Sequence, residues 1–164
     1  MVDFSELYRR YARDVHRFAL FLCGDRALAE DLTSETFVRA FVGRDDLRVD
    51  TVKAYLLAIA RNLYRDARRR DARVVPLDEA ASVHRQAGPD AAPDGGLRLE
   101  EILAAIQRLP ESDREALVLA VDRDLPYTRI AAILGCSVPA VKVRVHRARA
   151  KLRAILDEEQ PCRT

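Results

Sequence analysis

The stretch from Asp124 to Leu156 constrains the fold more than any other part of this 164-residue chain. Apolar residues recur at helical spacing from Tyr127 to Leu134, Gly135 follows them, and Ser137 precedes a second amphipathic segment. Glycine adopts the positive φ that often ends a helix, and serine is a common N-cap residue. The pattern therefore predicts a helix, a tight turn and a second helix.

The second of these helices combines a narrow apolar stripe with a high density of basic residues. The stripe recurs every three or four residues and is expected to dock on a partner helix: Val141, Val145, Ala148 and Leu152. Most other positions are basic or small, and no Asp or Glu lies between Leu125 and Leu156. An ordinary surface helix mixes charges of both signs, so this distribution favours a nucleic-acid contact over a merely solvated surface.

The side of this helix opposite the stripe suits the major groove of DNA. At roughly 100° per residue, Val143, Arg147 and Ala150 point away from the stripe, and basic residues lie on either side of them. Small or apolar side chains can touch base edges while the cations reach phosphate. We therefore expect a DNA-binding helix-turn-helix.

Composition limits the remaining possibilities. The chain is 49% hydrophobic, 33% charged and 6% aromatic with no Trp, which suits small helical bundles, and its net charge of +2 says little by itself. The three cysteines, Cys23, Cys136 and Cys162, are far apart and form no CxxC motif. We expect no disulfide framework, metal or cofactor. With no signal peptide and no membrane-spanning apolar run, the protein should be cytoplasmic, without membrane insertion.

The N-terminal part predicts two helices separated by a short turn. The first should run from about Ser5 to Leu22 and end at Gly24, and Asp25 should cap the second, which Gly43 closes. The inner side of the second helix is expected to hold Leu28, Leu32, Thr36, Phe37, Ala40 and Phe41. Its outer side is acidic, with Glu30, Asp31, Ser34 and Glu35, and is either solvated surface or a docking surface.

A third helix should begin after Asp50 and change character along its length. Its core positions are Val52, Leu56, Ile59, Ala60 and Leu63, and its last turns are crowded with arginines. One or two cations at a helix C-terminus are explained by the macrodipole, but this block exceeds that need. We therefore expect nucleic-acid contacts here, with Tyr55 and Tyr64 available to stack on bases.

The rest of the chain predicts a linker and a second helical domain. Residues 74–96 contain three prolines and three glycines among few large apolar residues, as in a flexible linker. An amphipathic segment from Leu97 to Leu109 ends at Pro110, and Ser112 with Glu115 forms a capping box for the next helix. The expected fold is all-α, with small helical domains at 1–73 and 97–164 and the helix-turn-helix in the second.

Four segments in this order resemble the bacterial RNA polymerase sigma factors of the extracytoplasmic-function group. They are AEDLTSETFVRAF, AYLLAIARNLYRDARRR, LPESDREALVL and YTRIAAILGCSVPAVKVRVHRARAKLR, and together they cover nearly the whole chain. The resemblance implies a subunit that binds core RNA polymerase, recognises promoter DNA and directs transcription initiation. Family members are commonly held inactive by an anti-sigma factor, which is a further expected partner.

The resemblance also implies roles for individual residues. Core polymerase would be bound by Asp31, Ser34 and Glu35, where Ser34 stands in place of a frequent Gln. The minus-ten promoter element would be bound and melted by the third helix, through Tyr55, Arg61, Asn62, Arg65, Arg68 and Arg69, and by the loop at about 43–51. The minus-thirty-five element would be bound by Lys142, Val143, Arg144, His146, Arg147 and Arg149.

Two other functions are weighed against this one. A stand-alone helix-turn-helix regulator would use its first domain to sense a ligand or dimerise, but a sensor domain has no need of an arginine block. An enzyme is disfavoured because His16, His84 and His146 lie on different segments with no spacing that suggests a triad or a ligand set.

Overall fold

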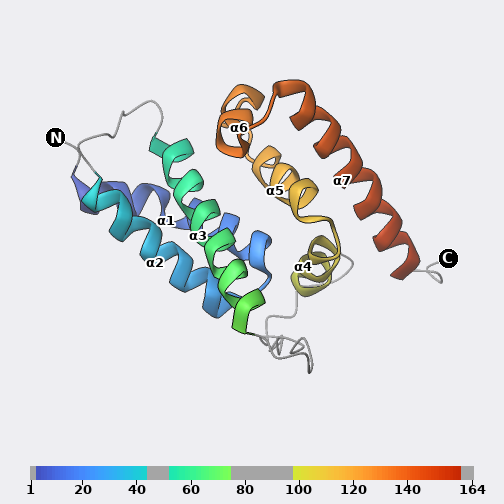
Figure 1. The fold of residues 1–164 in the computed structure, drawn as a ribbon, viewed down its shortest axis with the longest axis horizontal. Helices are drawn as coiled ribbons and strands as arrows, with labels where there is room; N and C mark the ends of the chain where they lie inside the picture. The colour runs from blue at the N-terminus through green and yellow to red at the C-terminus, as the bar shows by residue number, and fades with distance from the viewer. Residues whose placement is uncertain (1–2, 44–51, 75–97, 160–164) are drawn as a thin grey trace. The chain divides into compact units, whose positions relative to one another are not determined.

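The computed structural model describes residues 3–43, 52–74 and 98–159, and these residues form seven helices and no strands (Figure 1). The chain divides into two compact units, Met1–Ala91 and Ala92–Thr164. The prediction of an all-α protein with two helical domains is confirmed. The expected linker at 74–96 lies, except for Val74, outside the described residues, so its limits stay a prediction.

The first two helices of the first unit begin and end at residues that suit those positions. α1 spans Phe4–Cys23, and Gly24 after it has φ 71°, with its N–H donating to the Leu20 carbonyl. α2 spans Arg26–Val42, and the Asp25 carboxylate accepts hydrogen bonds from the first backbone N–H groups of the helix. Both ends agree with the sequence prediction, because glycine tolerates positive φ and aspartate caps free N–H groups.

The core of the first unit lies between α1, α2 and α3, which spans Val52–Val74 (Figure 1). All three helices supply large side chains that are at most 5% exposed: Leu7, Val15, Phe18, Leu22, Leu32, Phe37, Val52, Leu56, Leu63 and Tyr64. Ile59 is only partly buried, and Asp50, after which the third helix was expected to begin, lies outside the described residues. The apolar periodicity of the sequence thus located this core.

Near the start of α1, aromatic rings hold it against α2. The Phe4 ring centroid lies 5.0 Å from that of Phe41, and the Tyr8 centroid lies 4.9 Å from that of Phe37, both in edge-to-face geometry. Phe41 was expected on the inner side of α2 but is 45% exposed, so it lies at the edge of the core. Edge-to-face pairs of this kind add to the burial of apolar area.

The second unit begins with two short helices, α4 at Leu99–Gln107 and α5 at Glu111–Ala120. Pro110 occupies the N-cap position of α5, so Ser112 already lies inside the first turn and makes no capping hydrogen bond. The predicted capping box is therefore wrong. Glu115 is 1% exposed, on the side of α5 that is buried against its neighbours.

The last two helices confirm the predicted helix, turn and helix. α6 spans Tyr127–Leu134, Gly135 follows it with φ 66°, and α7 spans Val138–Glu159 (Figure 1). The Ser137 hydroxyl accepts a hydrogen bond from the Ala140 N–H at 3.2 Å, as expected of an N-cap. The turn is thus specified by two residues whose local preferences agree with it.

The apolar stripe of α7 packs on the rest of the second unit. Val141, Val145 and Ala148 are at most 2% exposed, and Leu152 and Ile155 are partly buried against Leu109 and Leu117. At the far end of α7, Arg108 forms ion pairs with Glu158 and Glu159 at 3.8 and 3.4 Å. α7 is therefore held by apolar contacts along most of its length and by ion pairs at its C-terminal end.

Candidate nucleic-acid interface

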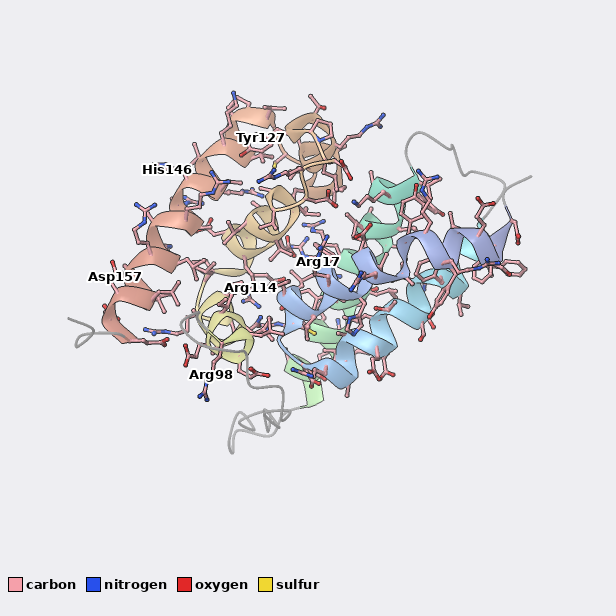
Figure 2. All side chains as sticks on the ribbon, turned by 180° about the vertical axis from the view of Figure 1, so that it is seen from behind. Arg17, Arg98, Arg114, Tyr127, His146 and Asp157 are labelled. Carbon is pink, nitrogen blue, oxygen red and sulfur yellow. The ribbon has the colours of Figure 1, made fainter. Side chains whose placement is uncertain are left out.

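The outer side of α7 carries the residues that the sequence assigned to DNA. Val143 is 54% exposed although it is apolar. Exposed basic side chains surround it, namely Lys142, His146, Arg147 and Arg149, while Arg144 is partly buried. Figure 2 shows His146 on the outer side of α7, turned away from α5. The structure thus brings an apolar tip and several cations together on one surface of a helix that follows a tight turn.

A second basic surface lies at the C-terminal end of α3. Arg68, Arg69, Arg70 and Arg73 are exposed, as is Asn62, while Arg65 is partly buried. The Arg69 guanidinium lies 3.8 Å from Asp66, and both side chains remain largely exposed. Such a pair contributes little to stability because water screens it. Three of the six expected minus-ten residues, Asn62, Arg68 and Arg69, are therefore exposed.

Two residues of α3 are not where the sequence prediction put them. Arg61 is 7% exposed, contrary to the expectation that it is free to contact a phosphate. Tyr64 is 0% exposed, and the Arg68 guanidinium lies over its ring at 5.9 Å from the centroid. The expectation that Tyr64 stacks on a base is wrong, because its ring is part of the core.

Tyr55 is partly buried and lies near the end of α2. A Cβ atom added to Gly43 would come within 2.8 Å of the Tyr55 hydroxyl oxygen, so the phenol packs closely on this glycine. Any larger residue at 43 would displace it. Tyr55 therefore links the start of α3 to the end of α2, and its contact with a base stays a prediction.

The outer side of α2 forms a surface of opposite charge. Glu30, Asp31, Ser34 and Glu35 are all exposed, and Glu35 makes an ion pair with Arg39 at 3.2 Å on the same helix. Further along α2, Val38 and Val42 are 55% and 80% exposed. We call Asp31, Ser34 and Glu35 the acidic edge. An exposed surface that combines this acidic edge with nearby apolar side chains suits a protein partner, and its negative charge repels phosphate.

Comparison with known proteins decides the family. Residues 7–74 match the profile of Sigma-70 region 2, and residues 99–152 match that of Sigma-70, region 4. The ECF RNA polymerase sigma factor EcfG of Rhodopseudomonas palustris is 40% identical over 85% of this chain and 77% of its own length. The chain belongs to the ECF sigma factors.

Other comparisons agree with this assignment. The ECF sigma factor SigM of Bacillus subtilis is 32% identical over 92% of this chain and 93% of its own length. Among solved structures, the sigma factor RpoE of Bartonella quintana, crystallised with the anti-sigma factor NepR, is 30% identical with a TM-score of 0.78. That alignment covers 94% of this chain and 97% of the other. This sigma factor is thus a transcription initiation factor that works with RNA polymerase.

The family assignment excludes the alternative of a stand-alone regulator. That alternative required the first domain to sense a ligand or dimerise, whereas residues 7–74 match Sigma-70 region 2. In the described ranges, no three His, Cys, Asp or Glu side chains lie close enough to hold a metal ion. None of the described helices has both the length and the apolar character needed to cross a membrane.

Sequence reasoning missed one residue beside the basic surface of α7 in this sigma factor. Asp113 of α5 is 1% exposed, and its carboxylate accepts a hydrogen bond from Arg147 Nη2 at 2.8 Å. Its other oxygen lies 3.5 Å from Lys151 Nζ. The sequence between Leu125 and Leu156 contains no acid, but folding brings one from a distant segment. The sequence signal for its burial is the helical spacing of three and four residues that separates Asp113 from Ala116 and Leu117.

Proposed function

We propose that this sigma factor uses three separate surfaces: the acidic edge for core polymerase, the end of α3 for the minus-ten element, and α7 for the minus-thirty-five element. The observation that supports this division is the separation of charge among exposed residues. The acidic edge on α2 has the wrong sign for phosphate, whereas the end of α3 and the outer side of α7 each carry several exposed cations. We propose domain limits at 1–73 and 97–164, with residues 74–96 as the tether.

On α7, the proposed contacts divide by chemistry. Val143 lies at the centre of the exposed side and offers only an apolar contact, which suits the methyl group of a thymine. The cations beside it reach phosphate or base edges: Lys142, Arg144, His146, Arg147 and Arg149. Phosphate contacts supply affinity and base contacts supply specificity. This sigma factor would therefore bind duplex DNA through α7 and select it with few side chains.

On α3, the proposed contacts serve to open the duplex. The exposed amide of Asn62 can form hydrogen bonds with the edge of an unpaired base, while Arg65, Arg68 and Arg69 neutralise the nearby backbone. Tyr55 at the start of the helix is a further candidate contact. Unstacking a base costs a few kcal/mol, so a prepared site for the extruded base lowers the free energy of opening.

We further propose that the protein acts without catalysis of its own, in the cytoplasm, and is controlled by an anti-sigma factor. The described His16 and His146 lie on α1 and α7, in different units of the chain. Support for the third point comes from RpoE of Bartonella quintana, which is similar over nearly its whole length and was crystallised with an anti-sigma factor.

The docking surface is tested by Asp31→Ala combined with Glu35→Ala. Because charged groups at an interface contribute strongly when desolvated, core polymerase should bind this variant at least about tenfold more weakly. Helicity and thermal unfolding should stay nearly unchanged, since both side chains are exposed and the Glu35–Arg39 pair is solvated. Fluorescence anisotropy of the labelled sigma factor titrated with core polymerase measures the affinity.

Glu6→Ala is the matched control, because it removes an exposed acid from the first turn of α1 in the same unit. This control should bind core polymerase like the wild type. Unchanged affinity of the double variant would show that the acidic edge is not the docking surface. Equal weakening by Glu6→Ala would indicate a general effect of net charge instead.

A further inference from the structure

The carboxylate of Asp113 is buried in the second unit, yet both of its partners are surface cations. The Asp113 side chain is 2% exposed, whereas the side chains of Arg147 and Lys151 are 52% and 49% exposed. Burying an unpaired carboxylate would be costly, so these two cations from α7 compensate for its charge. Asp113 thus lies directly beneath the edge of the proposed DNA-binding surface.

The contact restricts Arg147 more than Lys151. A distance of 2.8 Å between Arg147 Nη2 and Asp113 Oδ1 is typical of a strong, charge-assisted hydrogen bond, while Lys151 Nζ lies 3.5 Å from Oδ2. A guanidinium has five N–H donors in a planar fork, and this bond uses one of them. The remaining donors belong to a side chain that is half exposed, so Arg147 is both held and able to bind a second acceptor.

The opposite side of α7 lacks this restraint. Within the described ranges, Lys142, Arg149 and Arg153 take part in no ion pair. At roughly 100° per residue, these three residues lie on the other side of the exposed surface from Lys151. Among the described residues, one side of α7 therefore presents cations without an ion-pair partner, and the other presents a cation held by a buried negative charge.

We propose that Asp113 is a positioning residue for promoter recognition, which acts through Arg147. This inference rests on the proposed binding of the minus-thirty-five element by α7. Asp113 fixes the guanidinium so that little conformational entropy is lost when its free donors meet a base edge. Its negative charge also weakens the attraction of α7 for any DNA, whatever the sequence. Only the positioning of Arg147 raises discrimination between the correct element and other DNA, because a charge effect that is equal for all sequences leaves the ratio of affinities unchanged.

The test uses holoenzyme assembled from core polymerase and the full chain, carrying Asp113→Asn. The cognate duplex is first enriched from a random library by wild-type holoenzyme, and binding to it is compared with binding to a scrambled duplex at several salt concentrations. Asp113→Asn should bind the scrambled duplex several-fold more tightly and lose about tenfold in discrimination, the scale of one specific base contact. Glu101→Gln, which removes an exposed acid from α4, should retain wild-type discrimination.

A double-variant cycle separates positioning from a purely structural role. In an Arg147→Ala background, Asp113→Asn should cause no further loss of discrimination, because the residue through which it acts is gone. Loss of the same size in both backgrounds would overturn the proposal, as would unchanged discrimination in the single variant. If Asp113→Asn does not fold, Asp113→Ser replaces it, since it also lacks the charge and occupies less volume.

A measurement on the wild type needs no variant at all. Nitrogen-15 relaxation of the Arg147 Nε–H group should show an ordered side chain, in contrast to that of Arg149. Equal disorder of both groups would overturn the proposal. If α7 does not bind the minus-thirty-five element at all, the result is different. Wild-type holoenzyme would then enrich no upstream element whose binding depends on Lys142 or Arg149.

Discussion

In α3 the exposed arginines gather in the last turns, whereas in α7 the cations extend along much of the helix. The ion pair between Arg69 and Asp66 lies within α3 itself and is largely exposed. In α7, the corresponding partner of Arg147 is Asp113, a buried residue of another helix. Cations at the end of α3 are also favoured by the helix dipole. The basic surface of α3 is therefore explained by local sequence, and that of α7 depends on tertiary packing.

The two helices differ as well in what lies beneath their basic surfaces. α3 buries the large ring of Tyr64 directly under Arg68, while the side chains that α7 buries fully, such as Val145 and Ala148, are small. A large buried ring contributes more to stability than a valine does. We therefore expect substitutions of buried residues beneath α3 to act mainly on stability. Substitutions of residues on the outer side of α7 should act mainly on DNA binding.

The largest effect is expected from Tyr64→Ala. Removing a fully buried aromatic ring should lower the free energy of unfolding by about 3–5 kcal/mol, because it leaves a cavity as well as losing buried area. The corresponding change in α7, Val145→Ala, should cost about 2 kcal/mol. Denaturant titrations of the full chain, followed by circular dichroism, measure both values.

Tyr64→Phe is the control, since it keeps the ring and should cost no more than about 1.5 kcal/mol. If Tyr64→Ala leaves stability unchanged but abolishes promoter opening, the ring is a base-stacking group after all. The contrast between the interiors beneath α3 and α7 would then be incorrect.

A smaller effect is expected from Asn62→Ala, which concerns function and leaves the core intact. Asn62 is exposed and can reach an unpaired base, so its loss should reduce open-complex formation by about tenfold. In free energy, such a loss is a fraction of the few kcal/mol that base extrusion costs. Closed-complex affinity should change less than about twofold, because phosphate contacts dominate it. Permanganate footprinting reports opening, and gel-shift titration reports closed binding.

The control for this prediction is a pre-melted promoter, on which no duplex has to be opened. Wild type and Asn62→Ala should differ less on this template than on the intact duplex. An equal loss on both templates would remove Asn62 from the melting role and leave α3 as a plain phosphate-binding helix.

The smallest effect, about 1 kcal/mol at a single base pair, is expected from Val143→Ser. The exposed valine offers only apolar contact, and serine would exchange it for a hydrogen bond without changing charge. Arg149→Ala should instead weaken binding to all sequences and reduce the salt slope by about one unit. Binding to a panel of upstream-element variants at several salt concentrations distinguishes the two.

The opposite pattern would show that α7 is rotated in the groove relative to our proposal. In that case Val143→Ser would weaken every duplex alike, and Arg149→Ala would change base preference. The comparison with α3 would survive, but the division of α7 into apolar tip and phosphate-binding side would not.

Local signals in the sequence were sufficient for most of the fold. Gly24 and Gly135 end their helices with positive φ, and Asp25 and Ser137 cap the helices that follow. The signal at Ser112 was of the same kind but misleading, because Pro110 takes the N-cap position instead. The role of each of these residues depends on residues only a few positions away in the sequence. Such patterns can therefore be recognised without a structure.

The candidate site was predictable only where it depends on exposure along a single helix. Periodicity placed Val143 outward and Val141 inward, as observed. Periodicity could not show that Arg61 is buried, because a charged side chain at the start of an arginine-rich segment is normally expected at the surface. Nor could it pair Arg147 with Asp113, which lie 34 positions apart. Contacts between helices depend on how the helices pack, and no periodicity within one segment contains that information.

The outward position of Val143 also bears on how promoter preference can evolve. Its side chain is not part of the buried stripe of α7, so a substitution there changes recognition at little cost in folding. A duplicated copy of this gene could acquire a new set of target promoters through such changes one at a time. Arg147 is different, because replacing it leaves the buried Asp113 with one cation fewer. Divergence at that position would have to proceed through paired substitutions, in α5 and α7 together.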